Sequence, residues 1–440
     1  MKQQQELQNK LTRVLDQARH RGMDAAEALF ILETGFNVSV RHAEVETVEH
    51  HQAKTLHVTV YHDQRTGAAT TSDLSMEAIL AAVDKACSIA HYAGQDPCAG
   101  LADPQFLAYD YPDLQLYHHW KITPTQAINM AIECDTVARE QDPRITDAEG
   151  SSVSSYDSFK LYGNTHGFIG SYPQSFHTIN CGVVAQFGEK MQRDHEYTVA
   201  RAAADLDDPV IIAKQAAQKV LQRLNTRRLT TRRCPVIFHA PVAKGLLSSF
   251  IGAISGRNLY QKSSFLLDHL GKRIFPEFIH IYQEPHLIGG IASAPFDAEG
   301  VRTRDLDYIK DGILQNYVLG SYSSRRLKMP TTGNAGGVFN LGISHNQLDL
   351  SGLLQKMDTG LLVTELMGQG INLVTGSYSR GAVGFWVERG EIQYPVEEIT
   401  VAGQLQNMFA NLIAVANDTD CRGSIRTGSI LINEMTIAGE

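Results

Sequence analysis

Histidines and carboxylates gather near the N-terminus, where they could hold a metal ion. His42, Glu44 and Glu46 alternate along a stretch with strand character, close to the run Glu49-His50-His51. Because every second residue of a strand points to the same face, this alternation can bring imidazole and carboxylate ligands together. The same pattern also fits a solvated strand face that ends in a turn, and the density of exposed charge favours that second interpretation.

A second pair of candidate groups lies in the motif PFDAEGVRT (295–303). Asp297 and Glu299 could work as an acid/base pair, or they could shape a turn that leads to Arg302. The turn is the favoured interpretation. No Ser/His/Asp arrangement can be recognised from residue order, and GxSxG is absent. Gly368-Gln369-Gly370 is followed by Leu373 where GxGxxG needs glycine, so a nucleotide loop is not indicated.

The six cysteines are spread along the chain without a CxxC pair. No two of them have the spacing of zinc ligands, so we expect reduced thiols rather than a zinc cluster. Their positions are Cys87, Cys98, Cys134, Cys181, Cys234 and Cys421.

Composition points to a soluble protein of two or three domains. Of the 440 residues, 43% are hydrophobic and 20% are charged. A net charge of −9 argues against binding nucleic acid through bulk charge. The N-terminal sequence lacks the apolar stretch of a secretion signal, and no apolar run approaches the roughly 20 residues needed to cross a bilayer. We therefore expect a cytoplasmic protein without a membrane partner.

Hydrophobic periodicity predicts helices and strands in the first half of the chain. An amphipathic helix that packs on its own domain is expected at the start, with Leu7, Leu11, Val14, Leu15 and Ala18 on its apolar side. Further helices are predicted at 75–93, capped by Ser72 or Asp73, at 123–141, capped by Thr123, and at 209–224. Strands are predicted at 37–48 and 55–71, with a turn at 50–54, and over 145–199, with turns at 150–155 and at glycines 163, 167, 170 and 182.

The polar run NTRRLTTRRCP interrupts this pattern and predicts a domain boundary. Its arginines could form a nucleic-acid patch, but an acidic protein without interleaved aromatic residues favours a solvated linker with local ion pairs. The predicted organisation is an N-terminal α/β domain at 1–225, a linker at 226–234 and a strand-rich domain at 235–440, with helices at about 240–255 and 351–359. The fold class is α+β.

The segment 364–404 contains the most distinctive sequence motifs of the chain. Glycines separate short runs of Val, Ile, Phe, Tyr and Trp, and Arg389-Gly390 predicts a hairpin turn with Gly at positive φ. Its stretches TELMGQG and TGSYSRGAVGFWVERGEIQYPV, with AVANDTD further on, resemble the PmbA/TldE proteins, which are related to the TldD metalloproteases. Matches to that family extend in order from about Glu44 to the end of the chain: TSDL, DPCAG, FLLDHLGK, PFDAEGVRT, IKDGIL and TGNAGG.

The resemblance implies a zinc-binding helix in the TldD relatives, with the pattern HExxxH and a cysteine near the C-terminus as third ligand. Aligning GLLSSFIGA (245–253) with that helix puts Ser248 and Ala253 at the two histidine positions and Ser249 at the glutamate position, while Thr427 stands at the cysteine position. A hydroxyl or a methyl group is a poor zinc ligand and a poor general base. The resemblance therefore implies no cofactor in this chain and zinc in a partner subunit.

The same resemblance implies a non-catalytic subunit that pairs with a TldD-like protease chain. The complex would cleave unfolded or extended peptides, including leader peptides of modified peptide antibiotics and an antitoxin. The candidate peptide contacts are Glu365, Met367, Gly368, Gln369 and Gly370, since glycine permits close backbone approach. Two alternatives stay open, a metalloprotease active on its own and a gyrase-modulating binding protein, as does a homodimer of the isolated chain.

Overall fold

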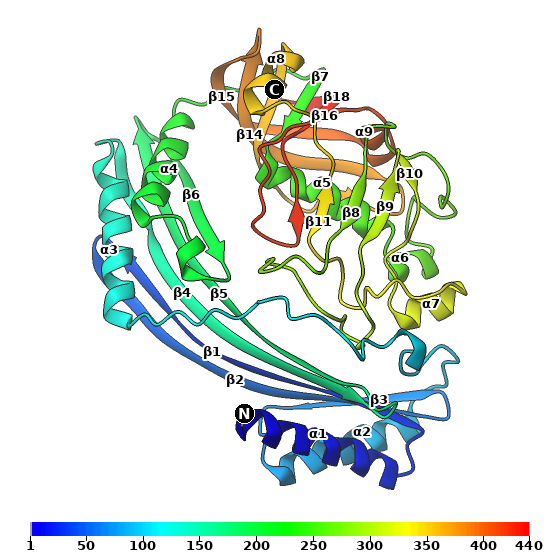
Figure 1. The fold of residues 1–440 in the computed structure, drawn as a ribbon. Helices are drawn as coiled ribbons and strands as arrows, with labels where there is room; N and C mark the ends of the chain where they lie inside the picture. The colour runs from blue at the N-terminus through cyan, green and yellow to red at the C-terminus, as the bar shows by residue number, and fades with distance from the viewer. Residues whose placement is uncertain (1, 440) are drawn as a thin grey trace.

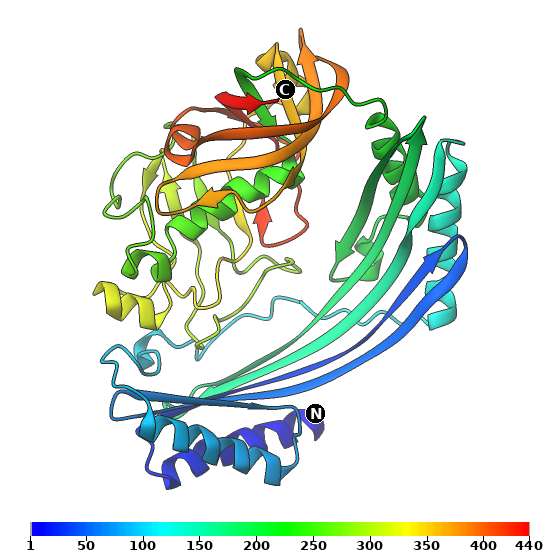
Figure 2. The same cartoon turned by 180° about the vertical axis from the view of Figure 1, so that it is seen from behind.

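The chain forms a long curved sheet and a second body that lies on the concave side of that sheet. The computed structural model describes residues 2–439. Figures 1 and 2 show the second body, from β7 (Arg232–Phe238) onward, facing the sheet. The link between α2 (Met76–Tyr92) and α3 (Pro124–Glu140) runs between the two parts and bonds to both: Leu114 O accepts from Gly289 N, and Leu116 O from Ser175 N.

Six antiparallel strands form the first sheet in the order β3-β2-β1-β4-β5-β6. Four of them are 17 to 20 residues long and extend to roughly 60 Å, a length over which normal strand twist gives the curvature seen in Figure 1. The bounds are β1 (Ala25–Arg41), β2 (Glu44–His62), β3 (Arg65–Thr71), β4 (Ile145–Asn164), β5 (Ile169–Phe187) and β6 (Lys190–Ala200).

Two helix pairs cover the convex face of this sheet, one pair at each end (Figure 1). They are α1 (Lys2–His20) with α2, and α3 with α4 (Pro209–Gln222). The five apolar residues predicted for the first helix are all buried against the sheet and α2. The prediction that α1 packs on its own chain is therefore confirmed.

The predicted turn at 50–54 is wrong. β2 runs without a break from Glu44 to His62 and pairs with β1 along its length. The chain reverses instead at His42-Ala43 and at Asp63-Gln64, where φ lies between 48° and 60° at all four residues. Turns with two positive φ values match the twist of antiparallel strands. The charged run was misleading because its side chains are exposed while its backbone is paired.

The turns predicted inside 145–199 are also mostly wrong. Residues 150–155 and Gly163, Gly170 and Gly182 lie within β4 and β5, and only Gly167 (φ 89°) lies in a turn. Two of these glycines provide space rather than a turn. A Cβ on Gly163 would lie 2.6 Å from Leu11 Cδ2, and one on Gly170 would lie 2.7 Å from a phenylalanine ring. The sheet thus needs glycine where other chain segments press on it.

Helix starts were predicted with mixed success. Helix α2 begins after Ser75, whose Oγ accepts from the N–H three residues on, rather than after Ser72 or Asp73. The Thr123 cap of α3 is confirmed, and Gln126 completes a capping box there. The predicted helix at 209–224 is α4, which starts after Asp208.

The second body contains two sheets. In the larger, the strands follow the order β12-β7-β18-β15-β14-β13, β16 pairs with β18, and β12 also pairs with β14, so five strands close into a ring that leaves few free edges. The smaller has the order β10-β9-β8-β11-β17. The bounds are β8 (Ile281–Gln283), β9 (Leu306–Lys310), β10 (Ile313–Leu314), β11 (Leu341–Ile343), β12 (Gly360–Met367), β13 (Ile371–Asn372), β14 (Ser377–Glu388), β15 (Glu391–Gln404), β16 (Leu412–Val415), β17 (Ile425–Arg426) and β18 (Ile430–Ala438).

Five helices accompany these sheets: α5 (Ala240–Ala253), α6 (Gly256–Tyr260), α7 (Ser321–Leu327), α8 (Leu350–Met357) and α9 (Leu405–Ala410). The predicted helices at about 240–255 and 351–359 correspond to α5 and α8. The hairpin predicted at Arg389-Gly390 is confirmed, with φ of 55° and 74°. The α+β fold class is confirmed as well. Over residues 2–439, no helix is both long and apolar enough to cross a membrane.

Candidate functional site

Helix α5 occupies the place where the resemblance implies a zinc-binding helix. Its first N–H group, on Ala240, donates to Ser429 Oγ at 3.0 Å, and that hydroxyl donates to Asp418 Oδ2 at 2.7 Å. The motif AVANDTD (414–420) therefore helps to hold the start of the helix. The apolar side of α5 is buried in the main core of the second body: Leu246, Leu247, Phe250 and Ala253.

The three helix positions named from the resemblance are not brought together. Ser248 is exposed, whereas Ala253 is fully buried. Ser249 is buried, and its hydroxyl donates to Gly245 O at 2.8 Å within the helix. The hydroxyl is thus already used by the helix itself.

Thr427 follows β17, which lies beside α5 and pairs in parallel with β11. Its side chain is buried, and its hydroxyl donates to Gly428 O at 2.9 Å. Its carbonyl oxygen accepts from Asp420 N at 3.0 Å, so the residue closes a turn of the loop 420–427. The threonine thus acts as a backbone and turn element of that loop.

The residues at these four positions do not fit a zinc ion. Ala253 has no donor atom, and the hydroxyls of Ser249 and Thr427 are neutral and engaged with carbonyl groups. Zinc in proteins is held by imidazole, thiolate or carboxylate groups. Nowhere in residues 2–439 do three or more His, Cys, Asp or Glu side chains gather in a way that could hold a metal.

The candidate peptide contacts at 365–370 lie at the end of β12. Glu365 accepts from Arg223 Nη2 at 2.5 Å, and Met367 is 46% exposed. Gly368 has φ of 79° with open space around its Cα, which suits a turn. Gln369 O accepts from Ile371 N at 2.8 Å. The segment is thus anchored at Glu365 and exposed at Met367.

Gly370 and the residues after it bring this segment onto α5. A Cβ on Gly370 would lie 1.7 Å from Ser379 O, so only glycine allows the two strands to approach this closely. Leu373 Cδ1 lies 3.0 Å from the position that a Cβ on Gly252 would take, which places the loop against the helix. The structure therefore places the candidate contact segment next to α5, although the two are more than a hundred residues apart in the sequence.

A network of charged side chains surrounds the start of α5, which the sequence did not indicate. Glu196 of β6 pairs with Lys219 of α4 at 2.5 Å and also with Arg422. Asp420 pairs with Arg422 at 3.0 Å and with Lys244 of α5 at 2.9 Å. These five groups connect the curved sheet to the second body beside a cavity of about 280 Å³.

The network also sets the ionisation of its members. Burial alone would raise the pKa of Asp420, but hydrogen bonds from Arg422 and Lys244 lower it to about 2. Burial likewise opposes ionisation of Glu196, yet the hydrogen bond from Lys219 lowers its pKa. His239, next to the first residue of α5, has its pKa lowered by burial. The acids of the network are therefore carboxylates at neutral pH.

The remaining candidates of the sequence are dispersed or structural. His42 lies in a turn and pairs with Asp147 at 2.9 Å, while Glu44 and Glu46 are exposed on β2. Asp297 accepts hydrogen bonds from three backbone N–H groups, including those of residues 299 and 301 at 2.9 Å. It therefore shapes a turn, as the favoured interpretation predicted, and does not form an acid/base pair with Glu299, which accepts instead from Ser321 N.

Comparisons with known proteins agree with this fold. Family models describe residues 26–90 as PmbA/TldA metallopeptidase domain 1, residues 117–224 as the central domain and residues 231–439 as the C-terminal domain. The chain is 48% identical over 417 residues to metalloprotease PmbA of Escherichia coli O157:H7, covering 95% of this chain and 93% of that protein. It is 47% identical to a PmbA homolog of Haemophilus influenzae, with 99% and 97% covered.

Solved structures share the fold over the whole chain. A candidate modulator of DNA gyrase from Bacteroides thetaiotaomicron superimposes with a TM-score of 0.93 at 26% identity, covering 99% of both chains. TldE of Thermococcus kodakarensis has a TM-score of 0.86 at 20% identity, covering 98% of this chain and all of its own, which is a likeness of fold. With this fold, the three family domains and close identity to PmbA over nearly its full length, the chain belongs to the PmbA/TldE family.

Proposed function

We propose that this chain is a non-catalytic subunit of a cytoplasmic zinc metalloprotease and that a TldD-type partner supplies the zinc ligands. The observation that carries the proposal is the chemistry of α5, where Ser248, Ser249 and Ala253 stand at the metal-binding and general-base positions. The metalloprotease names of the relatives support a role in proteolysis, and the neutral side chains on α5 support placing the chemistry in another chain.

The role we assign to this chain is to shape the space in which an extended peptide is held. Met367 is exposed at the end of β12, and residues 368–370, which follow it, are exposed as well. An extended peptide of little side-chain specificity can bind through its main chain at such a strand end. Unfolded proteins, leader peptides of modified peptide antibiotics and an antitoxin are the substrate classes that the family resemblance suggests.

Co-expression with a TldD-like chain tests the division of labour. The expected result is a complex of both chains with about one zinc ion per pair, as a single three-ligand catalytic site requires. Cleavage of an unfolded peptide and zinc content should both be lost when the partner's HExxxH histidines are replaced. Stoichiometric zinc on the isolated chain, together with casein cleavage, would instead favour a metalloprotease active on its own.

A surface variant tests the contact segment. Met367→Arg should lower peptide cleavage by the complex roughly tenfold, equivalent to about 1.4 kcal/mol of transition-state stabilisation, while the mass of the complex stays the same. Ile211→Arg on α4 is the matched control, because Ile211 is 48% exposed and does not line the cavity beside α5. Equal activity of the two variants would remove 365–370 from the peptide path.

The name of the Bacteroides thetaiotaomicron structure favours one further candidate, a protein that modulates gyrase. The acidic net charge is compatible with a protein partner but does not distinguish gyrase from others. Co-purification of gyrase with this chain in cells that lack any TldD-like protein would support the candidate.

A further inference from the structure

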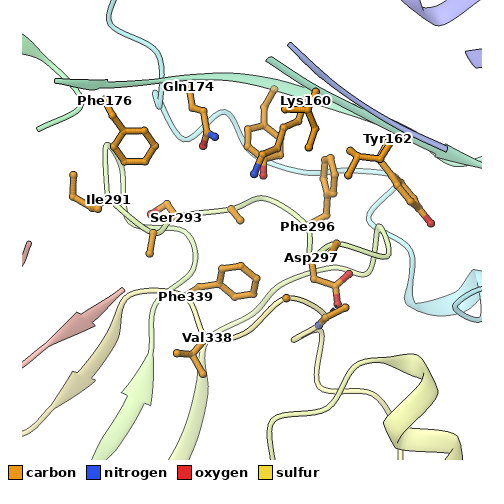
Figure 3. A pocket seen from close by; sticks show the side chains of 18 of the residues that line it. Lys160, Tyr162, Gln174, Phe176, Ile291, Ser293, Phe296, Asp297, Val338 and Phe339 are labelled. Atoms are coloured by element: carbon orange, nitrogen blue, oxygen red, sulfur yellow. Dashed lines mark hydrogen bonds between the residues drawn. The ribbon is translucent and has the colours of Figure 1, made fainter. Parts of the chain in front are cut away.

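A second cavity, of about 430 Å³, lies between the concave face of the curved sheet and two loops of the second body. In Figure 3, Lys160, Gln174 and Phe176 extend from the sheet toward the loops, Tyr162 lies to one side, and residues of the loops 291–298 and 335–339 form the opposite wall. Its volume is within the range of roughly 300–1,000 Å³ that small-molecule sites have. None of its lining residues belongs to the α5 region.

Arg201, which follows β6, places a buried positive charge in the wall of this cavity. The residue is 3% exposed, and its guanidinium stacks over the Phe176 ring at 4.0 Å from the centroid. Its four hydrogen bonds all go to neutral oxygens: Gln174 Oε1 at 3.3 Å, Ser175 O at 3.2 Å, Gly290 O at 3.4 Å and Ile291 O at 2.7 Å. A guanidinium has five N–H groups, so one is left over.

No carboxylate of residues 2–439 forms an ion pair with Arg201. Buried charges in proteins are normally paired, because an unpaired charge loses its hydration without compensation. Burial lowers the pKa of Arg201 to about 10, which reflects that loss. The arginine is therefore a buried cation whose counter-charge the chain does not supply.

Lys160 adds a second cation on the same side of the cavity. Its Nζ lies 5.9 Å from the centroid of the Tyr172 ring, and across the described part of the chain it has neither a hydrogen bond nor an ion pair. Burial lowers the pKa of Lys160 and the positive charge of Arg201 lowers it further, while the more weakly acting Glu33 raises it. Two neighbouring cations thus repel each other at the wall of the cavity.

The acid of the lining does not neutralise these cations. Asp297 is committed to three backbone N–H groups of the loops 297–301 and 335, and its carboxylate points away from Lys160 in Figure 3. Burial, together with the nearby charge of Glu299, raises the pKa of Asp297 to about 7, which weakens its negative charge at neutral pH. The rest of the lining is mostly apolar: Leu29, Ile31, Phe176, Ile291, Phe296, Val338 and Phe339.

We propose that this cavity binds a small monocarboxylate with an aromatic or branched apolar body. The carboxylate would accept a hydrogen bond from Lys160 Nζ and lie near the unused N–H of Arg201, while the body would pack against Phe296 and Phe339. A single negative charge can interact with both cations, and the apolar walls disfavour a ligand with more charge than that. The inference does not depend on the proposed protease role, because it uses none of the residues near α5.

The test compares 3-phenylpropionate with 3-phenylpropionamide, which has the same shape but no charge, by isothermal titration on the full chain. The acid should bind at least tenfold more tightly than the amide. Lys160→Met should remove that preference, and Lys160→Arg should retain most of it. Lys214→Met, at an exposed lysine of α4, is the matched control and should bind both probes as the original chain does.

Several outcomes would overturn the proposal. These are equal affinity for acid and amide, an unchanged preference in Lys160→Met, or no saturable binding of either probe. Displacement of 3-phenylpropionate by inorganic phosphate at equal concentration would contradict the assignment to carboxylates. Circular dichroism of each variant must show the native fold, and if Lys160→Met fails to fold, Lys160→Gln takes its place with the same expectation.

Discussion

Buried charges are paired around the start of α5 but unpaired in the cavity on the concave face of the curved sheet. Around α5, positive and negative groups alternate from Lys219 through Glu196, Arg422 and Asp420 to Lys244, and each acid is shared by two bases. In the cavity, two cations lie near each other and neither is paired with an acid across residues 2–439. Both regions join the sheet to the second body, so the difference is one of charge rather than of position.

The contrast separates a structural connection from a binding site. A fully paired network satisfies its own charges, and breaking it exposes a buried ion that has lost its partner. Two neighbouring cations without a carboxylate partner destabilise the folded chain, and a bound anion can remove that destabilisation. The pairing of its charges therefore indicates that the α5 network holds the two parts of the chain together. The lack of such pairing in the cavity supports its assignment as a binding site for an anion.

The largest expected effect comes from breaking the paired network. Asp420→Ala should lower the free energy of unfolding by about 3 kcal/mol, because Lys244 loses its acid and Arg422 keeps only Glu196, while both bases are largely buried. Urea unfolding followed by circular dichroism measures this difference. The control is Glu434→Ala, which breaks an exposed pair with Arg233 and should shift the unfolding midpoint far less. Equal shifts for the two variants would show that the network is no structural connection.

Acid titration gives a second, smaller test of the same network. The folded-state pKa of Asp420 is about 2, below the value near 4 of an unfolded aspartate, so its stabilising contribution is complete above about pH 5 and disappears as the pH falls toward 2. The stability difference between the original chain and Asp420→Asn should therefore be constant from pH 6 to about pH 5 and shrink below about pH 4. A difference that stays constant down to pH 3 would contradict the low pKa.

The sequence predicted those parts of the fold that depend on local patterns. The apolar stripe of α1, the Thr123 cap and the turn at Arg389-Gly390 are all properties of neighbouring residues, and all are confirmed. The predicted turns at 50–54 and 150–155 failed because these runs look like loops by composition. Their backbones are paired in long strands, and only the partner strand across the sheet decides that.

The candidate site was predictable only where the family resemblance reached. The helix predicted at about 240–255 is α5, and the motif AVANDTD contains both Asp418 and Asp420. The network around Asp420 was not found, because Glu196 and Arg422, which join its two halves, are 226 residues apart. The sequence likewise did not predict that Arg201 is buried without an acid partner. This arrangement depends on backbone carbonyls of residues 290 and 291, which no side-chain pattern encodes.

The smallest expected effect has the opposite sign and completes the comparison. Lys160→Met should leave the free energy of unfolding unchanged or raise it by up to about 1 kcal/mol, because it relieves the repulsion with Arg201 and adds apolar surface to an apolar wall. Thermal unfolding without 3-phenylpropionate measures the stability of the variant, and unfolding with it measures the stabilisation by the ligand. The ligand should raise the unfolding temperature of the original chain and not that of the variant. A clear loss of stability in Lys160→Met without ligand would mean that the lysine is already paired in the folded protein. Both regions would then be structural connections of the same kind.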